Sequence, residues 1–221
     1  MVKSMRAPSE DSELEDDTAE TTSAGDGREL TPDDLLMIRI QEGDQKAFDE
    51  LVHRHQKRLF YFFLDNLRDP HLAEDLAQET LLKVYNQSWD YLPLGRFTSW
   101  MYRVARNLLI DDYRKRSHDA LLHCRRPSED DGDNFLGGVA DDLSLPEEYA
   151  HKSEEQKKIH LLMQQLPDDQ RQTLTLHYFG NLKLHEIAEL MEANLATTKS
   201  RLRLAREKLK SLLEREGLDG S

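Results

Sequence analysis

Apolar residues that recur three and four positions apart constrain the fold of this chain more than any other feature of its sequence. This spacing places side chains on one face of an α-helix, whereas a strand would need strict alternation. One stripe follows Phe48, Leu51, Val52, His55, Leu59 and Phe63; others follow Ala73, Leu76, Ala77, Leu81 and Val84, and Trp100, Val104, Leu108 and Ile110. The pattern predicts an all-α fold.

Short polar residues, proline and glycine mark the expected ends of these helices. Thr and Asp side chains accept hydrogen bonds from the free N–H groups of a first turn, where proline also fits because it has no N–H. On this basis helices begin at Thr31-Pro32, after Asp44 and at Asp69-Pro70, and they end at Gly43, at residues 114–116, at Leu166-Pro167 and at Gly180-Asn181.

Acidic residues are concentrated in two segments, although the whole chain carries a net charge of −13. Residues 1–35 hold 3 basic and 11 acidic side chains, and residues 117–150 hold 2 and 9. The second of these segments interrupts the helical pattern, and a structureless stretch of its length is uncommon inside one compact domain. It therefore favours two domains. We therefore expect a disordered acidic extension at 1–30, a helical domain at 31–116, an acidic linker at 117–153 and a four-helix domain at 154–215.

The sequence also excludes several classes of protein. It has no apolar run long enough to span a membrane, and its acidic N-terminus does not resemble a signal peptide. The single cysteine, Cys124, cannot form an internal disulfide, which suits a reducing cytoplasm. We expect a cytoplasmic protein without membrane insertion.

No enzyme motif is present, neither a phosphate-binding P-loop, nor G-x-S-x-G, nor H-E-x-x-H. His53 and His55 are two apart on a helix and so point to different faces. His118, His123 and Cys124 match no familiar zinc spacing. We expect no catalysis, no small-molecule substrate, no cofactor and no metal.

A helix-turn-helix pattern occupies residues 184–213. Leu184, Ile187, Ala188 and Met191 form the apolar face of a short helix, and a turn at Glu192-Ala193-Asn194 follows it. Asn194 can cap a second helix, which has Leu202, Ala205, Leu209 and Leu212 on its buried side. The second helix of such a motif enters the major groove of DNA. Its first turn could reach base edges through Thr197, Thr198, Lys199 and Arg201, and its basic stripe of Lys199, Arg203, Arg206 and Lys210 suits phosphates. A solvated basic helix is the alternative.

Aromatic and basic residues alternate between positions 85 and 116. The aromatic residues are Tyr85, Trp89, Tyr91, Phe97, Trp100, Tyr102 and Tyr113, and the basic ones are Arg96, Arg103, Arg106, Arg114, Lys115 and Arg116. Stacking rings beside a basic track are typical of single-strand recognition. Taken alone, however, these residues favour a helical core with a basic rim. Both interpretations can hold together if Trp100 is buried in the core and the loop aromatics are exposed.

A polar face at residues 74–79 is the third candidate. Asp75 and Glu79 lie four residues apart and share one side of a helix, with Gln78 beside them. Such a face is usually solvated. The alternative is a docking surface for a basic partner.

These segments together resemble the extracytoplasmic-function (ECF) sigma factors of RNA polymerase. Residues 97–107, FTSWMYRVARN, are similar to the family's second conserved region, and residues 75–80, DLAQET, to its polymerase-docking helix. Residues 166–171, LPDDQR, with Tyr178-Phe179, Glu186-Ile187-Ala188 and residues 197–202, TTKSRL, are similar to its fourth region. The resemblance covers about residues 36–116 and 154–213 in the family's order.

The resemblance implies a factor that directs core polymerase, through its beta and beta-prime subunits, to specific promoter DNA, which it recognises and melts. It would assign core binding to Asp75, Gln78 and Glu79. It would assign the minus-ten element to Trp89, Tyr91, Arg96, Arg103, Arg106, Asn107 and Arg114, and the minus-thirty-five element to Thr197, Thr198, Lys199, Ser200, Arg201, Arg203 and Arg206. An anti-sigma factor is a further implied partner.

Two positions depart from the family pattern. Lys183 stands where Ser or Thr usually caps the first helix of the motif, and Glu192 stands where Gly is common in the turn. A left-handed conformation at Glu192 would cost about 1–2 kcal/mol. Two other functions stay open on the residues alone: a stand-alone helix-turn-helix regulator, and an adaptor that acts only through protein contacts.

Overall fold

The computed structural model of the chain describes residues 30–124 and 154–218, with side chains at 30–118 and 157–218. The predicted disorder of residues 1–30 and most of the predicted linker at 117–153 lie outside the described residues. Within the described ranges every regular element is a helix, which confirms the all-α prediction. The elements are α1 Pro32–Gln41, α2 Gln45–Leu67, α3 Pro70–Asn86, the 3-10 helix η1 Ser88–Asp90, α4 Phe97–Cys124, α6 Glu154–Met163, α7 Asp168–Tyr178, α8 Leu184–Leu190 and α9 Leu195–Arg215.

The predicted helix starts are confirmed by their caps. Thr31 Oγ1 accepts a hydrogen bond from the Asp34 N–H at 3.1 Å, and the Asp34 carboxylate accepts one from the Thr31 N–H at 2.8 Å. The Asp44 and Asp69 side chains accept hydrogen bonds from N–H groups in the first turns of α2 and α3, and Gly43 adopts a φ of +89° after α1. Each cap satisfies N–H groups that have no partner inside the helix.

The predicted end of the fourth helix at residues 114–116 was wrong, because α4 continues to Cys124. Basic residues are good helix formers and do not by themselves end a helix. Arg116 forms an ion pair with Asp112 at 2.8 Å, one turn earlier, and the first proline after it is Pro127. The sequence therefore offers no helix breaker at the predicted end.

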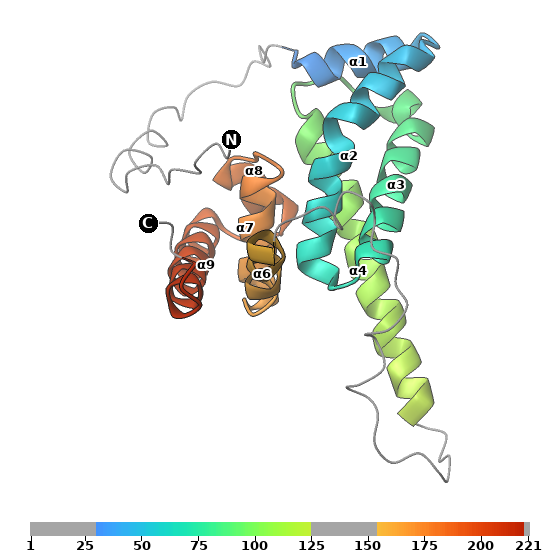
Figure 1. Ribbon diagram of the computed structural model, residues 1–221. Coiled ribbons are helices and arrows are strands. Elements are labelled where there is room, and N and C mark those ends of the chain that lie inside the picture. The colour runs from blue at the N-terminus through green and yellow to red at the C-terminus, as the bar shows by residue number, and fades with distance from the viewer. Residues whose placement is uncertain (1–29, 125–153, 219–221) are drawn as a thin grey trace.

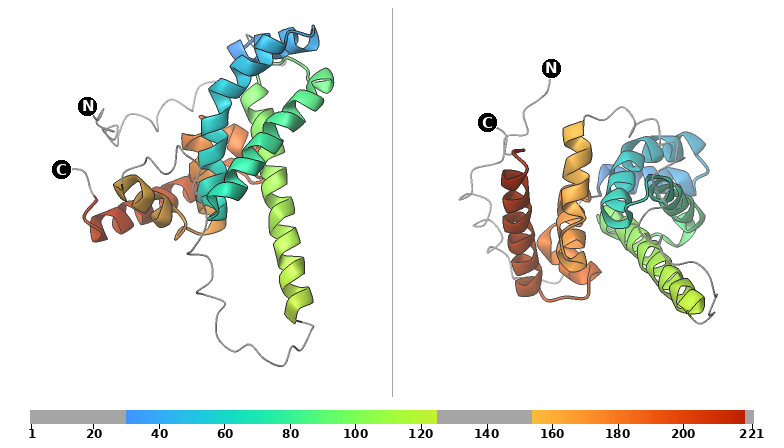
Figure 2. Two further views of the ribbon diagram at one scale, coloured as in Figure 1. Left: turned by 45° about the vertical axis from the view of Figure 1, so that its right-hand side comes forward. Right: turned by 60° about the horizontal axis from the view of Figure 1, so that its bottom comes forward.

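Helices α1 to α4 form the first unit (Figure 1). Helices α2 and α3 lie antiparallel across a short turn in which Arg68 has a φ of +63°, and α4 packs against α3. The largest fully buried side chains of this unit include Phe62, Phe63 and Tyr102. The C-terminal half of α4 extends beyond the other helices in both Figure 1 and Figure 2.

Helices α6 to α9 form the second unit, with α9 packed on α7, α8 and α6. Its own small core comprises Met163, Leu166, Leu174, Leu202 and Ala205. The predicted breaks at Leu166-Pro167 and Gly180-Asn181 are confirmed, because α7 begins at Asp168 and ends at Tyr178. No helix in the described ranges is both long and apolar enough to cross a membrane.

The two units touch along α2 and α4 (Figures 1 and 2). Helices α6 and α7 pack against α2, and α8 packs against α4. Apolar side chains in and on either side of α8, including Leu182, Ile187 and Met191, belong to the same buried cluster as the core of α1 to α4. Residues far apart in sequence therefore share one hydrophobic cluster.

Candidate nucleic-acid interface

The predicted helix-turn-helix is formed by α8, residues 191–194 and α9. Ile187, Ala188 and Met191 are buried, as the apolar face requires. Asn194 Oδ1 accepts a hydrogen bond from the Thr197 N–H at 2.7 Å, which confirms the predicted cap of α9. This cap fixes the direction in which the first turn of α9 leaves the motif.

The two unusual residues of the motif have visible consequences. The Lys183 side chain has no oxygen with which to cap α8, but Glu186 Oε2 accepts a hydrogen bond from the Lys183 N–H at 2.9 Å. One half of a capping box is therefore kept. Glu192 adopts a φ of +53°, so the left-handed turn that commonly uses glycine is present here with a side chain.

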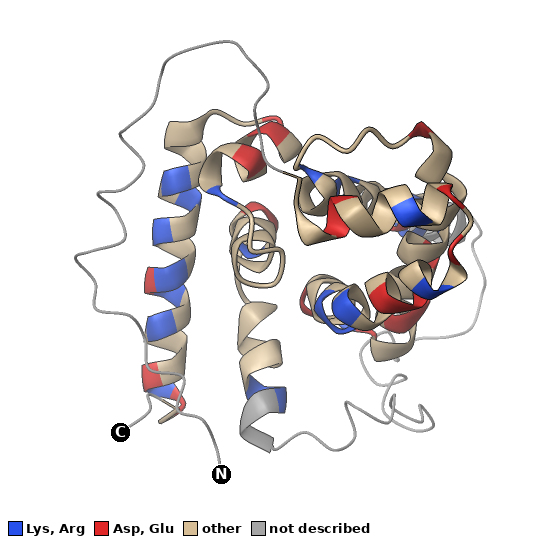
Figure 3. Cartoon of the chain, turned by 90° about the horizontal axis from the view of Figure 1, so that it is seen from above, with Lys and Arg blue, Asp and Glu red and all other residues tan. Residues whose placement is uncertain are grey.

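Basic side chains follow α9, the helix that ends beside the C label in Figure 3. Lys199, Ser200 and Arg203 are exposed near its first turns. Arg201 lies 2.5 Å from an Asp169 carboxylate oxygen of α7 and is about one quarter exposed. Arg203 pairs with Glu207 at 2.6 Å along the helix. The Arg203–Glu207 pair costs little to release, because ion pairs between exposed side chains are weak.

The remaining candidates on α9 are less accessible. Thr197 and Arg206 are half-buried, and the Arg206 guanidinium lies 5.7 Å from the centre of the Tyr178 ring. Thr198 is 1% exposed and its hydroxyl donates to the Asn194 carbonyl oxygen at 3.1 Å. Thr198 therefore supports the first turn of α9 from the inside.

The aromatic loop between α3 and α4 divides into exposed and buried rings. Trp89 in η1 is 72% exposed. Trp100 is half-buried, and its ring centre lies 4.8 Å from that of Tyr91. Tyr91, Phe97 and Tyr102 are buried. The interpretation as a helical core therefore holds for these three rings. The expected exposure of the loop aromatics is confirmed for Trp89 but was wrong for Tyr91, and Trp100, which was expected to be buried, is partly exposed.

Tyr91 has a buried polar anchor. Its hydroxyl donates a hydrogen bond to Asp34 Oδ1 at 2.5 Å, and burial together with the Asp34 carboxylate raises its pKa far above the ordinary tyrosine value. The Gln41 side-chain amide also donates to the Tyr91 carbonyl oxygen at 2.9 Å. The loop that carries Trp89 is therefore tied to α1.

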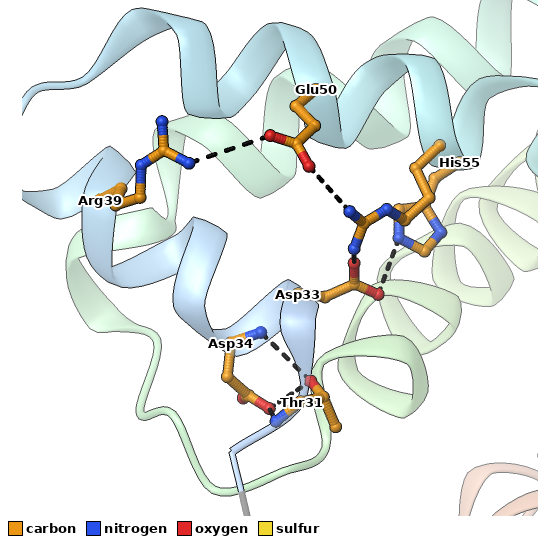
Figure 4. Close-up of polar contacts among 7 residues, drawn as sticks. Thr31, Asp33, Asp34, Arg39, Glu50 and His55 are labelled. Carbon is orange, nitrogen blue, oxygen red and sulfur yellow. Dashed lines mark hydrogen bonds and ion pairs between the residues drawn. The ribbon is translucent and has the colours of Figure 1, made fainter.

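A polar network holds α1 against α2 beneath this loop (Figure 4). Arg54 donates to Asp33 at 2.5 Å and to Glu50 at 2.9 Å, and buried His55 contacts the other Asp33 oxygen at 2.9 Å. Burial raises the pKa of Asp33, but the hydrogen bonds and charges of His55 and Arg54 outweigh burial and hold it below the ordinary value. As predicted, His53 points elsewhere and is exposed.

A cleft of about 250 Å³ lies between this loop, the start of α4, and α8. Its lining includes the aromatic and basic side chains of Trp100, Arg96 and Arg103, together with the Glu186 and Glu189 carboxylates from α8. Arg96 lies 4.0 Å from Glu189, and Ser99 Oγ donates to Glu186 Oε1 at 3.0 Å. The structure thus places residues of the two predicted DNA-binding units around one cleft.

The other basic candidates lie farther along α4. Asn107 is exposed, and Arg114 is mostly exposed at 3.6 Å from Asp111. Arg106 is half-buried, and burial lowers its pKa although the Glu192 and Asp169 charges oppose that change. Arg106 Nε has no hydrogen-bond partner among the described residues.

The candidate docking face lies on α3. Asp75, Gln78 and Glu79 are exposed, while Leu76 and Ala77 on the opposite side are buried. Exposed apolar side chains continue this face toward the end of α3: Leu82 is 57% exposed and Tyr85 is 42% exposed. Leu82 was not predicted to be a surface residue. Its position one residue after Leu81, off the apolar stripe, was the available signal.

No group of three or more His, Cys, Asp and Glu side chains suited to a metal ion occurs in the described part of the chain. The side chains of His123 and Cys124 lie outside the described residues.

Comparison with known proteins finds matches for both units. The family described as Sigma-70 region 2 matches residues 51–118, and that described as Sigma-70, region 4 matches residues 156–209. The RNA polymerase sigma-H factor of Pseudomonas aeruginosa is 32% identical over 187 residues, which cover 82% of this chain and 94% of that protein. The ECF RNA polymerase sigma factor SigW of Bacillus subtilis is 31% identical over 175 residues, 79% of this chain and 93% of that protein.

Two solved structures have a similar fold. The sigma factor RpoE of Bartonella quintana, in complex with the anti-sigma factor NepR, gives a TM-score of 0.60 at 21% identity and covers 76% of this chain and 98% of that chain. CnrH in complex with the cytosolic domain of CnrY gives a TM-score of 0.59 at 20% identity and covers 83% of this chain and 97% of that chain.

Proposed function

The chain belongs to the ECF sigma factors, which direct RNA polymerase to promoters and catalyse no reaction themselves, and from this premise we propose how its two units divide the work. The first unit, α1 to α4, binds the polymerase core and the minus-ten element. The second unit, α6 to α9, binds the minus-thirty-five element. The supporting observation is that exposed aromatic and basic side chains lie together on η1 and α4, exposed acidic side chains lie on α3, and a second set of exposed basic side chains lies on α9.

The minus-ten surface consists of Trp89, Trp100, Arg96, Arg103 and Asn107. An exposed indole offers a stacking platform for an unpaired base, and neighbouring guanidinium groups attract the phosphates of the same strand. The half-buried Arg106 and the exposed Arg114 extend the basic track along α4. Promoter melting follows, because a base held on these side chains is no longer available to its duplex partner.

Tyr91 positions the loop between α3 and α4 and does not itself contact DNA. Its ring packs against Trp100 and its hydroxyl is held by Asp34, so it fixes the loop that presents Trp89. A preorganised loop loses less entropy when it binds a strand.

The first turns of α9 read the minus-thirty-five element. Thr197, Lys199, Ser200 and Arg201 lie closest to the capped start of the helix, where residues of a recognition helix contact base edges. Arg203 and Arg206 lie one and two helical turns after Lys199, and their guanidinium groups suit phosphate contacts. Thr198 is buried and holds this turn in place.

The exposed face of α3 docks on the polymerase core. Asp75 and Glu79 supply negative charge, Gln78 supplies hydrogen bonds, and Leu82 with Tyr85 supplies apolar area that is open to solvent here. Charged groups steer a partner toward such a surface, and buried apolar anchors supply much of the affinity. By family resemblance the partner surface is the beta-prime subunit, and the beta subunit is a further expected partner.

The same resemblance points to regulation by an anti-sigma factor in the cytoplasm. One of the similar structures is of the sigma factor RpoE in complex with the anti-sigma factor NepR, and the other is of CnrH in complex with the cytosolic domain of CnrY. We extend that arrangement to this chain as a proposal.

Transcription in vitro tests the proposed function. Purified core polymerase would be combined with this chain and with fragmented genomic DNA, and the 5′ ends of the transcripts would be sequenced. We expect start sites that share two upstream elements and appear only when the chain is present. The same set of start sites with and without the chain would overturn the proposal. Glu79→Lys should reduce chain-dependent starts, whereas Lys158→Ala, an exposed change in the second unit, should not.

A further inference from the structure

One side chain of α1 holds both ends of the short helix η1. Gln41 is the last residue of α1 and is half-buried. Its side-chain amide donates to the Ser88 carbonyl oxygen at 2.7 Å and to the Tyr91 carbonyl oxygen at 2.9 Å. A primary amide has two N–H donors, so these two bonds use both of them. Gln41 therefore fixes the backbone immediately before and after the central residues of η1.

Trp89 lies between the two carbonyl groups that Gln41 holds. Ser88 is 2% exposed and Tyr91 is 6% exposed, whereas Trp89 is 72% exposed. The backbone on either side of Trp89 is thus buried and hydrogen-bonded, while its indole ring projects into solvent. A ring presented from a fixed backbone loses less entropy when a base stacks on it than a ring on a mobile loop.

The first turn of α1 holds the same loop from a second direction. Asp34 accepts a hydrogen bond from the Tyr91 hydroxyl at 2.5 Å, and Asp34 is itself fixed by its reciprocal bonds with Thr31 (Figure 4). Within η1, the Tyr91 N–H donates to the Ser88 carbonyl oxygen at 3.1 Å. Helix α1 therefore supports η1 through Asp34 near its start and Gln41 at its end.

This support is anchored to the core of the first unit. Asp33 contacts Arg54 and buried His55 of α2 at 2.5 and 2.9 Å. The apolar side chains of Leu36, Met37 and Ile40 on α1 are buried. A group carried by a packed helix is placed more precisely than one carried by a loop. The Gln41 amide thus transmits the position of α1 to η1.

We propose that Gln41 is a positioning residue for promoter opening, because it holds the Trp89 ring where an unpaired base of the minus-ten element stacks. This inference rests on the proposed function of Trp89. A base that leaves its pair in duplex DNA either pairs again or is captured, and a ring already in place captures it more often. Gln41 itself contacts only the protein.

The fluorescence of Trp89 tests the positioning directly. The chain has two tryptophans, so Trp100→Phe leaves Trp89 as the reporter. In this background Gln41→Met keeps the side chain but removes both donors, and Gln56→Met, the same change at an exposed position of α2, is the matched control. In time-resolved anisotropy of the free chain, we expect a larger amplitude of fast local motion of Trp89 in Gln41→Met than in Gln56→Met.

Transcription with core polymerase tests the consequence, in chains that keep Trp100. Two templates carry one promoter mapped by sequencing of 5′ ends: a duplex, and the same DNA with mismatched bases across the minus-ten element. Gln41→Met should lower the yield from the duplex about tenfold, the value of one or two lost hydrogen bonds. It should change the yield from the mismatched template much less, because no pairing competes there with capture of the base. Gln56→Met should leave both yields unchanged.

Equal motion of Trp89 in Gln41→Met and Gln56→Met would overturn the inference. Unchanged transcription from the duplex would overturn it too, as would an equal loss on both templates, because that loss indicates general damage. Should Gln41→Met lack the helical circular dichroism of the parent, Gln41→Glu is judged by the same measurements. It keeps the shape of the side chain but replaces the amide donors with acceptor oxygens.

A further substitution, Trp89→Ala, separates this inference from the proposed function. A loss of duplex transcription with Trp89→Ala, but not with Gln41→Met, refutes the positioning role alone. No loss with Trp89→Ala refutes the minus-ten assignment of Trp89, and the role of Gln41 with it.

Discussion

Replacing Glu192 by glycine should stabilise the protein, which is unusual for a change at a DNA-binding motif. Glu192 adopts a φ of +53°, a conformation that costs a residue with a side chain about 1–2 kcal/mol. Glycine adopts it freely but adds about 0.5–1 kcal/mol of chain entropy to the unfolded state. The expected net gain is about 0.5–1 kcal/mol, or a few degrees in Tm for a domain of this size.

The matched control is Glu192→Ala, which removes the same carboxylate but keeps the strained backbone. It should leave the free energy of unfolding nearly unchanged, because Glu192 is exposed and its attraction to Arg106 is weak in water. Both variants would be compared with the parent by urea and thermal denaturation. An equal gain in both would assign the effect to charge, and a loss with glycine would refute the strain argument.

Three further predictions concern stability and DNA binding. Asp33→Asn should cost about 1–2 kcal/mol near neutral pH, because it removes the negative charge that Arg54 and buried His55 contact, although Arg54 keeps its pair with Glu50. The pKa of Asp33 is lowered from 3.8, so the stability that its ionised form contributes is complete above that value and is lost as the pH falls through the lower folded value. The Tm of the parent should therefore fall more steeply with decreasing pH than the Tm of the variant. Arg201→Ala should weaken binding of polymerase holoenzyme to the minus-thirty-five element by about 1–3 kcal/mol in anisotropy titrations, while Arg215→Ala at the far end of α9 should not. Deletion of residues 1–30 should raise the affinity of the free chain for DNA at low salt, and a salt-dependence curve identical to that of the full chain would contradict this.

Local features of the fold could be predicted from the sequence because their causes are local. Thr31, Asp44, Asp69 and Asn194 cap helices through bonds to residues two or three positions away. The left-handed turn at Glu192 followed from a comparison with the family's glycine. Such interactions depend on a few neighbouring residues and little else.

Features that depend on tertiary packing could not be predicted in this way. The family resemblance assigned a DNA contact to Tyr91, and its place near the start of α9 suggested one for Thr198. Asp34, however, accepts a hydrogen bond from the buried Tyr91 hydroxyl, and the Asn194 carbonyl accepts one from the buried Thr198 hydroxyl. The contact between Asp65 and His160 joins residues 95 positions apart, and no local pattern marks it. These contacts are decided by how the helices assemble.

Tethered cleavage of promoter DNA tests the central claim, that the two units grip two separate elements of one promoter on the polymerase. In a Cys124→Ser background, a cleavage reagent would be attached to Asp111→Cys on α4 or to Leu204→Cys on α9, both exposed. With core polymerase present, we predict cuts near the minus-ten element from Asp111 and near the minus-thirty-five element from Leu204. Cuts at one shared position from both sites, or cuts that do not depend on the polymerase, would contradict it.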